Sequence, residues 1–169
     1  MRVLGIDPGT GITGYGVVEA EPGSAPHLIE CGVIRTLSRD SLPARLRLIH
    51  DELLGIIDRL GPELVAVEGI FAARNIRSAI ILGHTRGAIL LAAEERGVPI
   101  QEYSPAIVKQ TVVGRGAALK PQVGYMVAQL LRLKSAPRPA DAADGVAIAL
   151  THLLRIGPRS IRPLAGRRG

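Results

Sequence analysis

The stretch RVLGIDPGTGITGYGVVE, residues 2–19, decides the fold. Residues 2–7 are an apolar run that ends on Asp7, which is typical of a short buried strand. The Pro-Gly-Thr-Gly segment at residues 8–11 predicts a tight turn, and residues 12–19 return with the alternation of a second strand. A third strand is expected over residues 27–36, so the N-terminal part predicts an antiparallel meander.

After residue 36 the pattern changes to alternating helices and strands. The helix expected over residues 43–60 has an apolar stripe, Pro43 in its first turn and Gly61 at its end. A buried strand over residues 64–68 ends on Glu68. The remaining elements expected are a helix capped by Asn75 and running to about residue 96, a strand at 98–103, and helices at 105–111, 121–133 and 140–154. The whole pattern predicts an α/β fold, with a mixed five-stranded sheet flanked by helices, in which three antiparallel strands are followed by parallel strands.

Residues 1–156 are expected to form one domain, followed by a basic, disordered tail at 157–169 that carries four arginines and little apolar pattern. Basic residues are concentrated late in the chain: residues 103–169 contain 11 Lys or Arg and two acids, whereas residues 1–102 contain 10 and 13. This skew favours a polyanionic partner, although a solvated basic face is the alternative. No apolar run is long enough to cross a bilayer and the single cysteine is Cys31, so we expect a cytoplasmic protein without a membrane partner.

Four carboxylates are the candidate site. Asp7 and Glu68 each end an expected central strand, where the sites of α/β sheets form. Asp141 and Asp144 are the only acids of the basic half and lie three residues apart near the start of a helix, so they share one face. The alternative for this pair is that acids are favoured in first turns. Four converging carboxylates require cations, and their hard oxygens suit two Mg²⁺ ions, for which Mn²⁺ can substitute.

A glycine motif could indicate a dinucleotide site and a histidine could join the acidic site, but the surrounding sequence argues against both. Residues 9–14 match G-x-G-x-x-G after a strand, yet a dinucleotide site needs a helix next, and residues 15–19 read as a strand. His152 lies eleven residues after Asp141, about 16 Å along the same helix, and is taken as structural.

Basic and aromatic residues near these acids are candidate nucleic-acid contacts. Phe71 follows Glu68 in an expected loop and could stack on a base, or alternatively anchor that loop in the core. The expected DNA contacts are Phe71, Arg74, Arg77, Lys109, Arg115 and Lys120. Lysine is rare in this chain, and its use at Lys109 and Lys120 indicates a need for a compact charge.

With these residues in place, the chain resembles the RuvC family, the bacterial crossover junction endodeoxyribonucleases of the RNase H-like superfamily. The motifs that carry the resemblance are Gly5-Ile6-Asp7-Pro8-Gly9 with Thr13-Gly14-Tyr15-Gly16, Val67-Glu68 with Phe71, Ala73 and Asn75, Gln110-Thr111-Val112-Val113-Gly114, and Ala140-Asp141-Ala142-Ala143-Asp144 continuing to Ala147-Ile148-Ala149 and Thr151-His152. The chain departs from the family pattern at Gly69, Ile81 and Leu119, which leaves its fine DNA contacts open.

The resemblance implies an RNase H-like fold and a homodimer that resolves four-way (Holliday) junctions in recombination and repair. It implies paired, symmetric nicks that leave 5′-phosphate and 3′-hydroxyl ends, and cooperation with the RuvA–RuvB branch-migration complex. By position, Asp7, Glu68, Asp141 and Asp144 match the catalytic carboxylates. Lys109 and Lys120 match important basic residues, with Lys120 expected near the scissile phosphate, and Phe71 matches the aromatic that engages junction bases.

Two other functions stay open at this level, a non-catalytic DNA-binding or junction-scaffold protein and a sugar-kinase or actin-like ATPase, which would need two such domains. The dimer is expected to use the helix at 75–96, where Ala79, Gly83 and Gly87 recur every four residues. The alternative is that this strip packs on the protein's own sheet.

Overall fold

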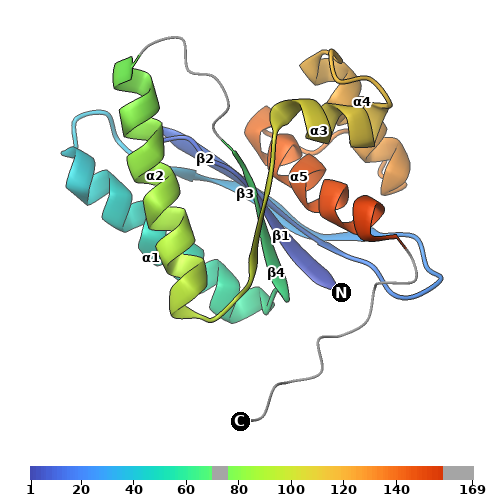
Figure 1. Cartoon of the computed structure of the whole chain (residues 1–169), viewed down its shortest axis with the longest axis horizontal. Coiled ribbons are helices and arrows are strands. Elements are labelled where there is room, and N and C mark those ends of the chain that lie inside the picture. The colour runs from blue at the N-terminus through green and yellow to red at the C-terminus, as the bar shows by residue number, and fades with distance from the viewer. Residues whose placement is uncertain (70–75, 158–169) are drawn as a thin grey trace.

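The computed structural model describes residues 1–69 and 76–157 and has a five-stranded mixed sheet between two groups of helices (Figure 1). The sheet order is β3-β2-β1-β4-β5. The strands are β1 (Arg2–Asp7), β2 (Ile12–Glu19), β3 (His27–Arg35), β4 (Leu64–Glu68) and β5 (Ile100–Tyr103). The helices are α1 (Leu42–Leu60), α2 (Ile76–Glu95), α3 (Pro105–Val113), α4 (Lys120–Leu130) and α5 (Ala140–Ile156).

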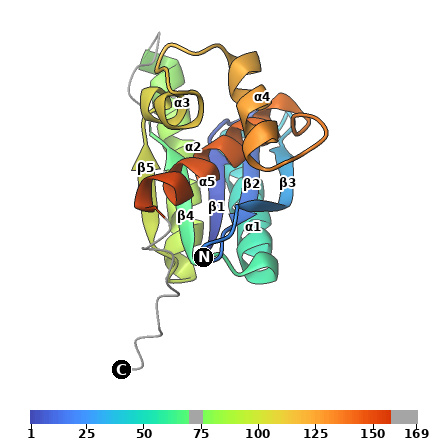
Figure 2. The ribbon, with the colours of Figure 1, turned by 90° about the vertical axis from the view of Figure 1, so that its right-hand side faces the viewer.

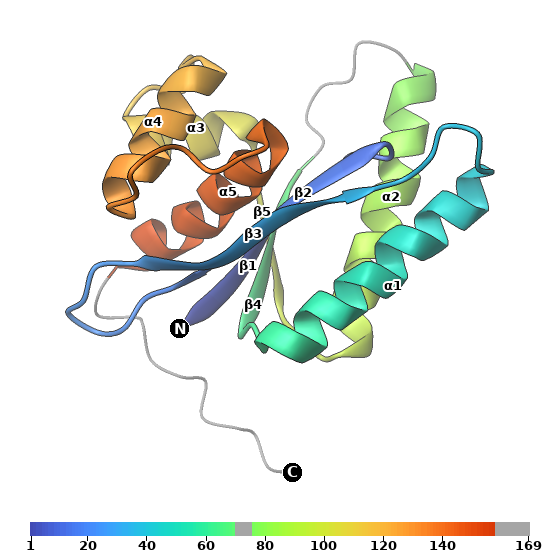
Figure 3. The same cartoon turned by 180° about the vertical axis from the view of Figure 1, so that it is seen from behind.

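The sheet is antiparallel on one side of β1 and parallel on the other. β1, β2 and β3 form the expected meander, and β1 pairs in parallel with β4, which pairs in parallel with β5. Helices α1 and α2 cover one face of the sheet and α3, α4 and α5 cover the other (Figures 1 and 3). The predicted mixed α/β sheet is therefore confirmed, including the change from antiparallel to parallel pairing.

Alternation along the central strands decides which face each acid occupies. Leu4 and Ile6 of β1 pack into the core beneath α1 and α2, whereas Val3 packs into the core beneath α5. Successive side chains of a strand point to opposite faces, so Asp7 shares the face of Val3. The same parity in β4, with Val67 in the α1–α2 core and Ala66 in the α5 core, places Glu68 on the α5 face.

Two glycines of β2 allow α5 to lie directly on the sheet. A Cβ atom built at Gly14 would lie 1.9 Å from the backbone oxygen of Asp141, and one at Gly16 would lie 2.3 Å from Val146 Cγ2. Real Cβ atoms do not approach other atoms this closely, so only glycine permits this packing. The glycine interruptions of β2 are thus the structural basis for the position of the α5 N-terminus.

The helix ends follow the expected capping chemistry at α1 and α3. The Ser104 hydroxyl accepts a hydrogen bond from the Ile107 amide at the start of α3, and Ser41 does the same for Ala44 in α1. Gly61 and Gly114 end these helices in the left-handed conformation that glycine adopts without strain. Of these four capping residues only Gly61 was predicted from the sequence; Ser41, Ser104 and Gly114 are seen in the structure.

Several element boundaries differ from the prediction by one to three residues; α3, for example, extends to Val113 rather than residue 111. β5 starts at Ile100 rather than residue 98, because the Val98 amide donates to the carbonyl of Ala93 and ends α2. α4 ends at Leu130 rather than near residue 133. Its last turn is closed by the Leu133 amide bonding to Ala128, with Arg132 in the left-handed conformation at φ 53°. A non-glycine residue there leaves no sequence signal for the helix end.

The buried residues of helix α2 are Thr85, Ile89, Ala92 and Ala93. The helix is long and apolar enough by length and composition to span a membrane, alone among the described helices. However, Ile89, Ala92 and Ala93 pack with residues of α1 in the core on this face of the sheet. Gly83 and Gly87 are exposed, and a Cβ at either would meet nothing within 4 Å. The alternative that this strip packs on the protein's own sheet is therefore wrong.

A candidate metal-dependent nuclease site

Two acids of the site come from the carboxyl ends of adjacent parallel strands. Ile6 of β1 pairs with Val67 of β4, so Asp7 and Glu68 each follow directly at the same edge of the sheet. Because parity places both on the α5 face, their side chains enter one pocket. Asp7 and Glu68 therefore lie close together, as their strand-end positions predicted.

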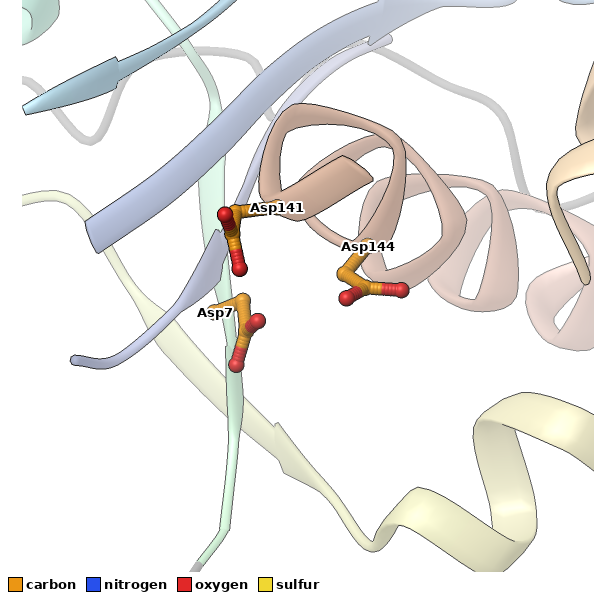
Figure 4. A group of neighbouring side chains, drawn as sticks. All are labelled: Asp7, Asp141 and Asp144. Carbon is orange, nitrogen blue, oxygen red and sulfur yellow. The ribbon is translucent and has the colours of Figure 1, made fainter. Parts of the chain in front are cut away.

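The other two acids come from the first turns of α5, which lies across this edge. Figure 4 shows Asp141 beside Asp7 and Asp144 one turn further along the helix. One carboxylate oxygen from each of these three residues lies within 4.8 Å of the others. Glu68 lines the pocket with Asp7 and Asp144 but is outside this closest group. Three of the four acids therefore form a tight cluster, with the fourth at its side.

Lys120 brings a positive charge to the cluster from the first residue of α4. Its Nζ donates to Asp144 Oδ2 at 2.7 Å, while its side chain is 70% exposed. A cation at a helix N-terminus opposes the helix dipole, so the position is explained by the carboxylates it faces. The pocket between these groups has a volume of about 190 Å³. Its lining also includes Lys109 of α3 and the apolar residues Pro105, Val108, Val123 and Ala147.

Burial and mutual repulsion alter the ionisation of the acids. Burial, followed by the charges of Glu68 and Asp144, raises the pKa of Asp7 to about 7 from an ordinary 3.8, against the opposing effect of Lys120. Burial and the charge of Asp144 likewise raise the pKa of Glu68. The pKa of Lys120 is raised by its hydrogen bond to Asp144. The cluster thus has excess negative charge that its lysines only partly balance.

This donor set fits a hard divalent cation. Carboxylate oxygens are the preferred ligands of Mg²⁺ and Mn²⁺, and a bound cation would offset the repulsion that raises the pKa of Asp7. No histidine or cysteine belongs to a group with metal-ligand spacing within residues 1–69 and 76–157. The arrangement is suited to metal-assisted hydrolysis of a phosphate ester.

The other predicted residues lie in different parts of the chain, and only one of those that the structure describes lines the pocket of the acids. Lys109 lines the same pocket as the acids. Arg77 is exposed at the start of α2, and Arg115 is exposed between α3 and α4. Phe71 and Arg74, together with the predicted cap Asn75, lie outside the described residues. His152 is buried and accepts or donates a hydrogen bond at 2.8 Å with the Tyr103 hydroxyl, which agrees with its structural interpretation.

Sequence reasoning missed the apolar wall of the pocket, formed by Pro105, Val108, Val123 and Ala147. These residues follow ordinary helical periodicity, which does not distinguish a wall of a site from the rest of the core. It also missed that Gly14 sets the position of Asp141. Glycine within a strand was the available signal for such a close approach.

Comparison with known proteins agrees with this geometry. The family model of the crossover junction endodeoxyribonuclease RuvC matches residues 3–152. A protein of that name from Parafrankia sp. is 46% identical over 162 residues, covering 96% of this chain and 90% of the relative.

Two solved structures extend the similarity to three dimensions. The RuvC structure from Thermus thermophilus superposes with a TM-score of 0.85 at 41% identity, covering 97% of this chain and all of the other. The same protein in complex with a Holliday junction substrate gives 0.84 at 40% identity, covering 94% and 98%. With a family model over most of its length and relatives above 40% identity, the chain belongs to the RuvC family of crossover junction endodeoxyribonucleases.

Proposed function

We propose that this chain is a structure-selective endonuclease that resolves four-way DNA junctions by hydrolysing phosphodiester bonds with Mg²⁺ held by Asp7, Glu68, Asp141 and Asp144. The observation that carries the proposal is the cluster of three carboxylates within 4.8 Å of one another, with Glu68 and Lys120 beside it. A protein that only binds junctions has no need of this repulsive cluster, since bringing like charges together costs stability.

The residues of the site divide the chemical work. Two divalent ions held by these four carboxylates would activate a water and stabilise the leaving oxygen of the phosphodiester, and the expected products have 5′-phosphate and 3′-hydroxyl ends. The cations would lie at the point where the polyanionic strand must approach. Their ligands would be Asp7, Glu68, Asp141 and Asp144. Mn²⁺ offers the same preference for oxygen ligands and can substitute. Lys120 places its ammonium beside the carboxylates, where negative charge develops on the phosphate during hydrolysis.

The decisive experiment compares a synthetic four-way junction with a linear duplex of the same sequence. With Mg²⁺ we expect symmetric nicks in two strands of like polarity on the junction and little cleavage of the duplex. With EDTA we expect binding without cleavage. Cleavage products that a ligase reseals would establish the end chemistry. Junction binding without any metal-dependent nicking would instead favour a non-catalytic scaffold.

Lys120→Ala should reduce cleavage about a hundredfold while weakening junction binding only slightly. The reason is that a preorganised charge aimed at a developing anion acts mainly on the transition state. Single-turnover rates with saturating protein separate the two effects. Arg39→Ala is the matched control, because Arg39 is exposed and lines neither this pocket nor its neighbour. A loss confined to affinity would make Lys120 a phosphate contact.

The active molecule is proposed to be a homodimer that pairs through α2. Ile80, Gly83, Gly87 and Leu91 leave an exposed apolar and small-residue surface on this helix, which suits close helix approach. Gly83→Leu should give monomers that bind junctions weakly and lose paired incision, since a leucine in the strip keeps the helices apart. Light scattering and nicking of both strands measure this. Gly55→Leu on α1, another exposed helical glycine, is the control. Unchanged dimer mass would contradict the assignment.

Further DNA contacts are proposed at Phe71, Arg74, Arg77, Lys109 and Arg115. Phe71 and Arg74 lie outside the described residues and are proposed from the sequence alone. The basic segment 157–169 is proposed as a tail beyond the nuclease domain of residues 1–156. Cooperation with a RuvA–RuvB complex and a cytoplasmic location are proposed on the family resemblance.

A further inference from the structure

A second pocket opens directly beside the carboxylates. It has a volume of about 520 Å³ and lies between the N-terminal parts of α4 and α5 and the segment that joins them. Lys120 and Asp144 line both this pocket and the acidic one, so the two are neighbouring compartments of one surface. Figure 2 shows α4 beside α5 with the connecting segment looping around them. The size falls within the range of small-molecule sites, about 300–1,000 Å³.

The lining of this pocket is apolar and stiff. Pro121, Pro137 and Pro139 contribute pyrrolidine rings, and Gly124, Ala136, Ala140 and Ala143 contribute small surfaces. We call it the proline pocket. Rigid apolar walls lose little conformational entropy when a flat ring packs against them, because proline and alanine have few or no rotamers to restrict. Gly124 keeps the space open, since a Cβ there would already lie 3.4 Å from Ala136 Cβ.

The surroundings of the proline pocket are positively charged. Arg138 lines it directly and is exposed, and Arg132 and Lys134 precede it in the same connecting segment and are exposed. The only acids of this half of the chain are Asp141 and Asp144, which belong to the metal cluster. An apolar cavity surrounded by cations and joined to a phosphodiester-cleaving site matches a nucleotide, with its base in the cavity and its phosphates at the rim.

We propose that the proline pocket receives the nucleobase next to the scissile phosphate, turned out of the stack of the cleaved strand. The inference rests on the proposed nuclease function, because that function places the strand across Asp144 and Lys120. Successive phosphates of a strand are separated by only about 3.4 Å along the duplex axis, so a flanking nucleotide reaches the adjacent compartment. Enzymes that act on extruded bases hold them against apolar side chains in this manner.

This role would also favour junctions over continuous duplex. Removing a base from the stack costs least where it is already unpaired or poorly stacked, and strand exchange at a junction centre provides such bases. A pocket of fixed volume accepts one base shape better than another, so it would contribute a preference for the nucleotide at that position. Neither effect requires contact with the metal ligands.

The test combines a filled pocket with a missing base. The positions tested are the two nucleotides on each side of the cleaved bond. Each of four junctions carries an abasic nucleotide at one of these four positions. Their single-turnover cleavage by the full-length wild-type protein is compared with that by Gly124→Leu, whose side chain would occupy the cavity. At one position we expect the abasic site to slow the wild type roughly ten- to a hundredfold, which is the scale of one lost stacking contact.

Gly124→Leu should slow cleavage of the intact junction by a similar factor and should be slowed no further by the abasic site at that position. Gly55→Leu should match the wild type on every substrate. The proposal would be overturned if the abasic site slowed Gly124→Leu by the same factor as the wild type at all four positions. It would also be overturned if Gly124→Leu cleaved the intact junction at the wild-type rate. Either result would leave the pocket to another occupant, such as a partner protein. If Gly124→Leu fails to fold by thermal scan, Ala136→Leu fills the same cavity from the connecting segment.

A second readout does not depend on cleavage. A junction with 2-aminopurine at the same position is titrated with protein in EDTA. We expect its fluorescence to change on binding the wild type but not Gly124→Leu, because the base leaves the stack only when the pocket is open. Identical responses would overturn the base assignment. If no metal-dependent cleavage occurs while the fluorescence responses differ as expected, the nuclease proposal fails and the base site stands.

Discussion

Asp7→Asn should slow junction cleavage by at least about a thousandfold while leaving junction binding intact or slightly tighter. Asp7 belongs to the cluster of three carboxylates, and an amide holds a divalent cation poorly, so the metal's stabilisation of the transition state is lost. Removing a negative charge that faces a polyanion does not weaken its binding. Single-turnover cleavage and a binding assay in EDTA measure the two properties.

Asp40→Asn provides the matched control for this variant. Asp40 is an exposed acid in the turn before α1, away from the pocket, and its replacement should leave the rate unchanged. Glu68→Gln and Asp141→Asn should be as severe as Asp7→Asn, and Asp144→Asn should also be severe although more replaceable. Near-normal cleavage by Asp7→Asn would contradict the whole site assignment.

The same variant should change stability in a pH-dependent way. In the metal-free folded protein the Asp7 carboxyl stays protonated up to a pKa of about 7, whereas in the unfolded chain it ionises near 3.8. The folded state therefore binds the extra proton between these values, and stability falls as pH rises through this window. In EDTA, Asp7→Asn should exceed the wild type in Tm by several degrees at pH 8 and by less at pH 5. Saturating Mg²⁺ should stabilise only the wild type. A Tm difference independent of pH would contradict the raised pKa.

Gly14→Ala should be the most damaging substitution outside the acids. Its Cβ would lie 1.9 Å from the backbone oxygen of Asp141, so either α5 or β2 must move. Such overpacking costs about 2 kcal/mol or more, which corresponds to a Tm lower by roughly 4–8 °C for a chain of this size. Displacing Asp141 by even 1 Å should reduce cleavage about a hundredfold.

The control for Gly14→Ala is Gly11→Ala in the neighbouring turn. A Cβ at Gly11 would meet only Arg45 Nη2 at 3.8 Å, which is an ordinary contact. This variant should keep the wild-type Tm and rate. Thermal unfolding and single-turnover cleavage measure both variants. If Gly14→Ala kept its Tm and its activity, direct packing of α5 on β2 would not be what positions Asp141.

Much of the site could be predicted from local pattern. Alternation in β1 and β4 places Asp7 and Glu68 on one face, and their strand-end positions place them at one edge once the strands are parallel. The three-residue spacing of Asp141 and Asp144 places both on one side of α5. Gly61 marks the end of α1. Each of these is a property of neighbouring residues, so a linear pattern contains it.

Only the tertiary structure decided which of these residues meet. The contact of Lys120 with Asp144 joins residues 24 apart, and Glu68 lies at the side of the tight cluster rather than within it. The exposure of Gly83 and the existence of the proline pocket depend on how whole helices pack. Periodicity identifies an apolar face but carries no information on its partner or on the space that remains between two helices. Those are set by side-chain volumes summed across the fold, and they appear only when the chain is assembled.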